Sequence, residues 1–194
     1  MRRILASAAL ALIFAATLSA CSGGDDPETF AFHSPGGQVE IFYDEKQRKP
    51  IEGISGESLM EPGADIALSD FTGEVVVLNA WGQWCAPCRA EVDDLEEVHK
   101  ALQEQGSGTV LGINVRDYNP QIARDFVADN GVTYPSIYDP PFKSAGHLGG
   151  VPSSVIPTTI ILDTQHRPAA VFLREITAQD ILAVTDKLNE EATA

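Results

Sequence analysis

The chain has 194 residues, which is enough for one domain with a sizeable hydrophobic core. Its 28 aspartates and glutamates outnumber its 13 lysines and arginines, and the formal net charge at pH 7 is −15. We therefore expect no nucleic acid as a partner, and no attraction to an anionic membrane surface through charge.

The first twenty residues differ from the rest of the chain. Arg2 and Arg3 precede an apolar run at 4–18, a layout that is typical of a secretory signal. At roughly fifteen residues the run is short for a membrane-spanning helix, which needs about 20; an uncleaved anchor is the alternative. The four residues that end at Cys21 (Leu-Ser-Ala-Cys) resemble a bacterial lipobox. We expect residues 1–20 to be a lipoprotein signal peptide and Cys21 to be lipidated.

Residues 21–38 are polar and rich in Gly, Asp and Pro, so they predict a flexible tether, followed by one folded domain at 39–194. In that domain, apolar runs of strand type alternate with amphipathic segments. Strands that alternate with helices, then two adjacent strands and a helix, predict an α/β fold around one mixed sheet. In chain order we expect a strand at 39–43, a charged turn at 44–50, an irregular segment at 51–65, a strand at 75–80, a helix at 89–105, a strand at 109–115, a helix at 120–130, a strand at 134–138, a short helix at 142–148, strands at 158–162 and 169–174, and a helix at 178–190.

Two cysteines, Cys85 and Cys88, stand two residues apart between the buried-type strand and the first long helix. Free N–H groups and the helix dipole favour a thiolate at a helix start, so the pKa of Cys85 should fall below the usual value of about 8.5. Such a dithiol can reduce a partner's disulfide or accept electrons from a partner's thiols. The alternatives are a structural disulfide and half of a zinc site. No second Cys or His pair stands at ligand spacing, so we expect no metal.

Three neighbours of the cysteines are candidate site residues. Glu91 follows Cys88 by three positions, so both side chains should lie on one helix face, where the carboxyl could exchange protons with the thiol or simply help the helix dipole. Pro87 suits the first turn of a helix. Trp84 should cover the rim of the site, whereas Trp81 is expected in the core.

On these residues the chain resembles the thioredoxin-like superfamily, and within it the membrane-tethered extracytoplasmic reductases of the TlpA/ResA type. The resemblance is carried by the segment 68–81, the Trp-Cys-Ala-Pro-Cys motif at 84–88, Glu91, and Ile-Pro-Thr-Thr at 156–159. It implies a thioredoxin-like fold with a central mixed β-sheet flanked by helices, an inserted helix-strand unit at 120–138, and an N-terminal β extension. Residues 51–59 match the family's first strand poorly.

The resemblance also implies roles. Cys85 would be the attacking thiol, and the less exposed Cys88 would resolve the mixed disulfide, with Glu91 handling its proton. Plain thioredoxins carry a buried aspartate where this chain has Asn79, which moves proton handling further toward Glu91. Pro157 would follow a cis peptide bond that faces the cysteines, and the backbone of Ile156 would pair with substrate. The substrate-binding residues implied are Trp84, Ala86, Pro87, Ile156 and Pro157, and no cofactor is implied.

The expected function is therefore a lipid-anchored thiol–disulfide oxidoreductase on the outer face of the cell membrane, most simply a reductase of exported disulfides. The subfamily points to apocytochrome c as substrate and to a membrane thiol carrier as electron donor. A disulfide-forming oxidase is the enzyme alternative, and a copper-binding surface lipoprotein is a remote one, because the four histidines share no spacing. A peroxiredoxin would need a lone peroxidatic cysteine in a Pro/Thr-rich loop, and we find none.

Overall fold

The computed structural model describes residues 28–193; the predicted signal peptide, Cys21 and the start of the predicted tether lie outside this range. A six-stranded sheet in the order β1-β8-β7-β4-β5-β6 forms the centre of the domain. β4, β5 and β6 are parallel, whereas β7, β8 and β1 add antiparallel pairs, so the sheet is mixed as predicted. The strands are β1 Glu40–Phe42, β4 Val75–Trp81, β5 Gly108–Asn114, β6 Ser136–Tyr138, β7 Thr158–Leu162 and β8 Pro168–Phe172.

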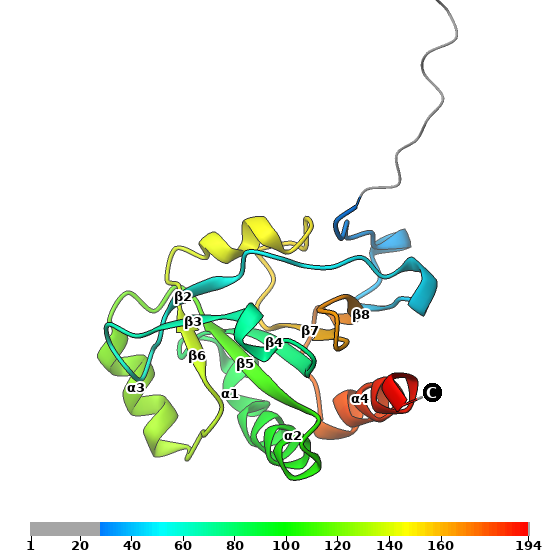
Figure 1. Ribbon diagram of the computed structural model, residues 1–194. Coiled ribbons are helices and arrows are strands. Elements are labelled where there is room, and N and C mark those ends of the chain that lie inside the picture. The colour runs from blue at the N-terminus through cyan, green and yellow to red at the C-terminus, as the bar shows by residue number, and fades with distance from the viewer. Residues whose placement is uncertain (1–27, 194) are drawn as a thin grey trace, which may run out of the picture.

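The helices cover both faces of this sheet. α2 and α4 lie together on one face, and the N-terminal segment lies with a short 3₁₀ helix, Lys143–His147, on the other (Figure 1). Within residues 28–193, no helix is both long enough and apolar enough to cross a lipid bilayer. The α-helices are α1 Ala86–Ala90, α2 Val92–Gln105, α3 Pro120–Asp129 and α4 Ala178–Thr193.

Strand alternation divides the core into two layers, because successive side chains of a strand point to opposite faces of a sheet. In β4, Val75 and Val77 pack beneath α2 and α4, whereas Val76 and Leu78 pack on the opposite face. By the same period of two, Asn79 lies on the α2 and α4 side. A fully buried polar side chain therefore enters the layer beneath the helices, close to the end of the strand.

Local signals explain where the helices begin and end. Asn119 accepts a hydrogen bond from the Gln121 amide at 3.1 Å and so caps α3, which starts at Pro120 as the sequence predicts. Gly106 ends α2 in the left-handed conformation, with φ of 62°. These boundaries depend only on neighbouring residues, and the sequence located both.

Two local predictions are wrong. The segment 51–65, expected to be irregular, contains β2, Ser55–Glu57, which pairs antiparallel with β3, Asp65–Ala67, in a small separate sheet. The single helix expected at 89–105 is two helices, because Glu91 separates α1 from α2 with φ of −89° and ψ of −1°. In both cases contacts distant in sequence decide the conformation: Leu59 bonds to Ser136 beside the hairpin, and Glu91 bonds to residues beneath the helix.

The part of the predicted tether that the structure describes is folded onto the domain. Phe30 is only 8% exposed, and its ring meets that of Tyr43 edge to face at a centroid distance of 5.4 Å. The Phe32 amide donates to the Gly149 carbonyl at 2.8 Å. Within the segment 21–38 that the sequence predicts as a tether, Phe30 is therefore buried by residues that are distant in sequence, and Phe32 is half-buried.

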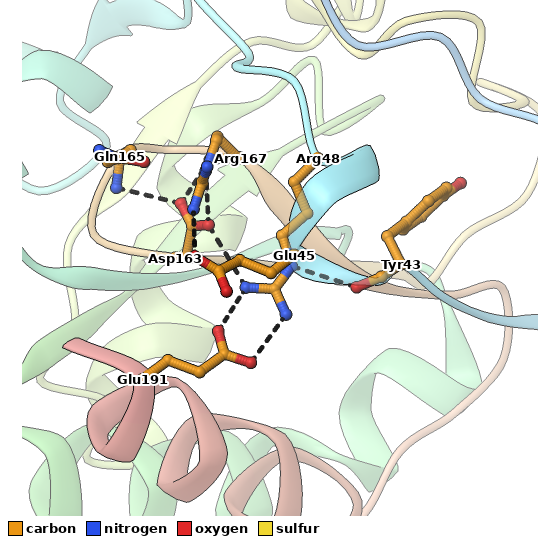
Figure 2. A network of polar contacts seen from close by, with 7 residues as sticks. All are labelled: Tyr43, Glu45, Arg48, Asp163, Gln165, Arg167 and Glu191. Atoms are coloured by element: carbon orange, nitrogen blue, oxygen red, sulfur yellow. Dashed lines mark hydrogen bonds and ion pairs between the residues drawn. The ribbon is translucent and has the colours of Figure 1, made fainter. Parts of the chain in front are cut away.

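The buried Arg48 connects the segment around Tyr43 to the C-terminal helix α4, as Figure 2 shows. The Arg48 guanidinium donates to both carboxylate oxygens of Glu191 in α4, at 2.6 and 3.2 Å, and to the Tyr43 carbonyl at 3.1 Å. It also lies 3.5 Å from Asp163, which pairs with Arg167 at 2.8 Å in the turn between β7 and β8. One side chain thus links three regions that are distant in sequence.

Candidate active site

The two cysteines of the motif form a disulfide at the start of α1, directly after β4. The chain leaves β4 through a tight turn in which the Cys85 amide donates to the Gly82 carbonyl at 3.0 Å. A Cβ at Gly82 would lie 2.8 Å from the Val115 carbonyl oxygen, so this turn requires glycine. Cys85 is the N-cap of α1, and its Sγ accepts from the Cys88 amide at 3.2 Å.

The disulfide belongs to a cluster of buried apolar residues. Cys85 is 3% exposed and Cys88 is 4% exposed, so the predicted difference in exposure between the two residues is absent in this oxidised form. The cluster brings together β4, α3 and the segment after β2; its other buried residues are Leu59, Trp81, Ala123 and Val127. Trp81 belongs to the core, as expected.

Glu91 is a buried carboxyl group beneath the start of α2. It is 1% exposed, and one oxygen accepts from Asn79 Nδ2 at 2.8 Å while the other accepts from the Ile176 amide at 3.1 Å. Burial raises the pKa of Glu91 to about 7, against the opposing effect of these two hydrogen bonds. The group can therefore hold or release a proton near neutral pH, as a general acid or base requires.

The loop before β7 lies against the disulfide. The Ile156–Pro157 peptide bond is cis, as the resemblance predicted. The carbonyl oxygen of Ile156 lies 3.7 Å from Cys85 Sγ. The structure therefore brings together the cysteines and the Ile-Pro segment, which are about seventy positions apart in the sequence.

The rim of the site is formed by Trp84 and by Arg116, which sequence reasoning missed. Trp84 is 44% exposed, and its indole N–H donates to the Val115 carbonyl at 3.0 Å. The Arg116 guanidinium lies over the indole ring at 5.6 Å and donates to the Ser153 carbonyl at 2.8 Å. Arg116 thus bridges the tryptophan and the loop that leads to Ile156. Ala86 is exposed and Pro87 half-buried in the first turn of α1.

A second missed group supports the active-site turn from beneath. The Asp117 carboxylate accepts from the Gln83 amide at 2.8 Å and from Asn114 Nδ2 at 2.7 Å. The carboxyl ends of the parallel strands β4 and β5 lie side by side, which brings these residues together. Asn114 and Asp117 lie at the end of an apolar run, which is a sequence signal for a site. That signal does not identify the Gln83 amide as the partner of Asp117.

Among residues 28–193, no three or more His, Cys, Asp or Glu side chains are grouped so that they could hold a metal ion.

The fold and this disulfide define the chain as a thiol–disulfide oxidoreductase with a thioredoxin-like fold. Residues 55–167 match the AhpC/TSA family, and the chain belongs to this family.

Individual relatives agree with this assignment. The "Thiol-disulfide oxidoreductase ResA" of Geobacillus thermodenitrificans is 27% identical over 142 residues, which are 72% of this chain and 79% of that protein. The crystal structure of a secreted thiol-disulfide isomerase from Corynebacterium glutamicum is 65% identical, with a TM-score of 0.82 over 84% of this chain and 98% of that one. A DsbF homologue from Corynebacterium diphtheriae is also 65% identical, with a TM-score of 0.78 over 82% and 99%.

Proposed function

We propose that this chain is a reductase that acts outside the cytoplasmic membrane, using Cys85 and Cys88 to reduce disulfides of exported proteins. The observation that carries this direction is the sparse support for a thiolate at Cys85. Among the described residues, the one hydrogen-bond donor to Cys85 Sγ is the Cys88 amide, at 3.2 Å. The cation nearest in sequence, Arg89, donates to the Gln83 carbonyl at 2.8 Å.

This observation bears on direction because a stabilised thiolate favours the reduced dithiol, and therefore makes a strong oxidant. Here α1 has only five residues, which limits its dipole, and the cluster around the sulfurs is apolar. Burial with a single hydrogen-bond donor gives a charged sulfur little compensation for its lost hydration. The disulfide is then favoured over the dithiol, and the dithiol is a reductant.

The reaction transfers two electrons. The Cys85 thiolate attacks one sulfur of the substrate disulfide, forming a mixed disulfide and releasing the other substrate sulfur as a thiolate that takes up a proton. Cys88 gives its proton to Glu91, and the resulting thiolate attacks the Cys85 sulfur. The Cys85–Cys88 disulfide forms, and the second substrate sulfur leaves as a thiolate that is protonated in turn. The protein dithiol is oxidised and the substrate disulfide is reduced.

The proposed substrate contact is the loop before β7 together with the rim. Ile156 precedes the β7 ladder and adjoins Cys85, so its backbone can pair with an extended peptide as an added strand. Exposed Trp84 and Ala86 and half-buried Pro87 would line the other side of that peptide. We propose apocytochrome c, with its Cys-x-x-Cys-His segment, as the substrate.

We further propose that the protein is tethered to the membrane by lipid on Cys21 and is re-reduced by a membrane thiol carrier. A reduced dithiol in an oxidising compartment needs such a dedicated source of electrons. The secreted status of the Corynebacterium glutamicum relative supports the extracytoplasmic location. Mass spectrometry of the N-terminus of the exported protein tests the lipid.

One alternative has specific support: the two structures at 65% identity are described as a thiol-disulfide isomerase and as a DsbF homologue. An isomerase or an oxidase would use the same disulfide and the same apolar cluster. These roles differ from a reductase in the stability of the reduced dithiol, which a potential measures directly.

The test is the reduction potential of the Cys85/Cys88 couple in glutathione and dithiothreitol buffers at pH 7. We expect a value at or below about −250 mV, near that of thioredoxin. A value near about −120 mV would overturn the reductase in favour of an oxidase, and one near about −180 mV, with re-activation of a scrambled disulfide protein, would favour an isomerase.

The same preparation tests the substrate. The reduced protein should reduce an oxidised Cys-x-x-Cys-His peptide faster than a peptide of the same composition in scrambled order. Equal rates would contradict apocytochrome c as the substrate and leave the direction of electron flow unaffected.

A further inference from the structure

We propose that Asn79 is a positioning residue for Glu91: its amide, held by Thr159, donates to the Glu91 carboxylate and keeps that group available to accept the proton of Cys88. This inference rests on the proton-handling role of Glu91 proposed above. Asn79 and Thr159 would then take part in the reaction indirectly. Among the described residues, neither side chain forms a hydrogen bond to a sulfur of the disulfide.

The three residues form a chain across the sheet. Asn79 in β4 and Thr159 in β7 are direct partners in the antiparallel register, and neither is exposed to solvent. Because Val75 and Val77 point beneath the helices, the period of two directs Asn79 toward the junction of α1 and α2. Glu91 occupies that junction.

The Asn79 amide nitrogen uses both of its hydrogens. It donates to Glu91 Oε1 at 2.8 Å and to Thr159 Oγ1 at 3.0 Å. The second carboxylate oxygen accepts from the Ile176 amide at 3.1 Å. Each oxygen of the Glu91 carboxyl group therefore receives one donor, which is the arrangement that stabilises the charged form.

The side-chain carbonyl oxygen of Asn79 indicates that this residue is present for function and not for stability. Asn79 Oδ1 is buried and has no hydrogen-bond partner among the described residues. A buried polar atom without a partner is destabilising, and an apolar side chain of similar size at this position would avoid that cost. The position nevertheless holds an asparagine that donates to Glu91. A destabilising polar residue of this kind is expected where a functional site requires it.

The Asn79 donor opposes the effects of burial and of the negative charges around Glu91. Burial raises the pKa of this carboxyl group, and the charges of Glu175 and Asp94 raise it further. Tyr134, a buried phenol, also interacts electrostatically with Glu91, whereas Cys88, three positions before Glu91, is held in the disulfide. The Asn79 hydrogen bond is the larger of the two that lower the pKa, so its loss should leave Glu91 protonated at neutral pH, unable to accept a proton.

The experiment is the pH profile of single-turnover reduction of a peptide disulfide, followed by tryptophan fluorescence, in the wild type and in Asn79→Leu. Leucine has a similar size but offers no donor. We expect the acidic limb of the profile to move up by about one pH unit, so that the rate at pH 7 falls about fivefold while the alkaline plateau is retained. A ¹³C titration of the Glu91 carboxyl group in the oxidised protein should show the same upward shift.

Glu175→Gln is the matched control. It removes an exposed negative charge that raises the pKa of Glu91, so the limb should move slightly in the opposite direction. A uniform fall in rate for Asn79→Leu, with neither the limb nor the titration displaced, would overturn the proposal, because a merely structural asparagine predicts that result.

Two further comparisons keep the test decisive. If Asn79→Leu does not fold, Thr159→Val should produce a smaller upward shift that Thr159→Ser reverses, and an unmoved limb in Thr159→Val would then overturn the proposal. Glu91→Gln distinguishes a failure of the positioning role of Asn79 from a failure of the proton-accepting role of Glu91. Loss of the limb in this variant, with no shift in the Asn79 and Thr159 variants, refutes the role of Asn79 alone; an unchanged limb refutes the role of Glu91 itself.

Discussion

At the scale of single residues, the environment of a side chain decides what its chemistry can be. Glu91 and Glu97 are both acidic residues at the start of the same helical region, but Glu91 is buried and Glu97 is exposed to solvent. The sequence singled out Glu91 only through its spacing from Cys88. Its raised pKa comes from the layer beneath α2, which sequence spacing does not describe.

The buried carboxyl group of Glu91 should make stability depend on pH. Its pKa is about 7 in the folded protein and about 4.5 without burial, so the folded state holds the proton more tightly. The contribution to the free energy of unfolding is therefore fully present below about pH 4.5 and is lost as the pH rises to about 7. The shift of about 2.5 pKa units corresponds to about 3 kcal/mol.

Urea unfolding of the oxidised protein measures this loss. The stability of Glu91→Gln relative to the wild type should increase by about 3 kcal/mol between pH 4 and pH 8, because glutamine does not ionise. Asp94→Asn serves as a comparison, since no comparable change is expected from that variant. A difference between Glu91→Gln and the wild type that stays constant with pH would contradict the burial effect.

At the scale of elements, the strands of the central sheet were predicted more accurately than helix breaks and the segments that connect the elements. The positions of β4, β5 and β7 follow from runs of apolar residues, and each strand lies within about one residue of its predicted range. The break at Glu91 and the hairpin of β2 and β3 were missed. Both depend on bonds to residues far along the chain, which no local pattern contains.

The loops around the active site are joined by Arg116, a residue in the left-handed conformation with φ of 60°. Arg116→Ala would remove its contact with the Trp84 ring and its hydrogen bond to Ser153. Each interaction contributes on the order of 1 kcal/mol. We expect the KM for a peptide disulfide to rise about tenfold with little change in kcat, because the loop before Ile156 would lose its support.

Steady-state kinetics of Arg174→Ala provide the control for this prediction. Arg174 also lies over an aromatic ring, that of Phe172, at 5.3 Å, but it is bound to Glu40 and Asp180 on another part of the surface. This variant should keep the wild-type KM. Equal KM values for Arg116→Ala and the wild type would show that the bridge at the rim does not organise the peptide site.

At the scale of the whole molecule, the sheet separates two apolar layers, and the chain ends contribute to both. The N-terminal segment closes one layer through Phe30, and α4 closes the other (Figure 1). Arg48 connects these regions through its bidentate contact with Glu191 (Figure 2). The folded domain therefore begins earlier in the sequence than its composition indicates.

Arg48→Met should show how much this connection contributes. Removing the guanidinium leaves the Asp163 carboxylate with Arg167 and the Gln165 amide and releases Glu191, so we expect the free energy of unfolding to fall by about 3 kcal/mol. Glu191→Gln is the matched variant. Its carboxylate is one-third exposed and glutamine can still accept a bond, so the loss should stay below about 1 kcal/mol. Equal losses in urea unfolding would contradict a dominant role of the buried arginine.

The sequence by itself determined the redox pair, the order of the strands of the central sheet, the class of fold and the cis proline, the last through its family resemblance. Each of these follows from local spacing or periodicity, or from a motif that is contiguous in the chain. Tertiary structure alone decided that Asn79 and Thr159 meet Glu91, that Arg116 bridges the rim, and that the segment around Phe30 is folded. The physical reason is that these contacts are set by strand pairing and layer packing, which join residues whose separation along the chain carries no local signal.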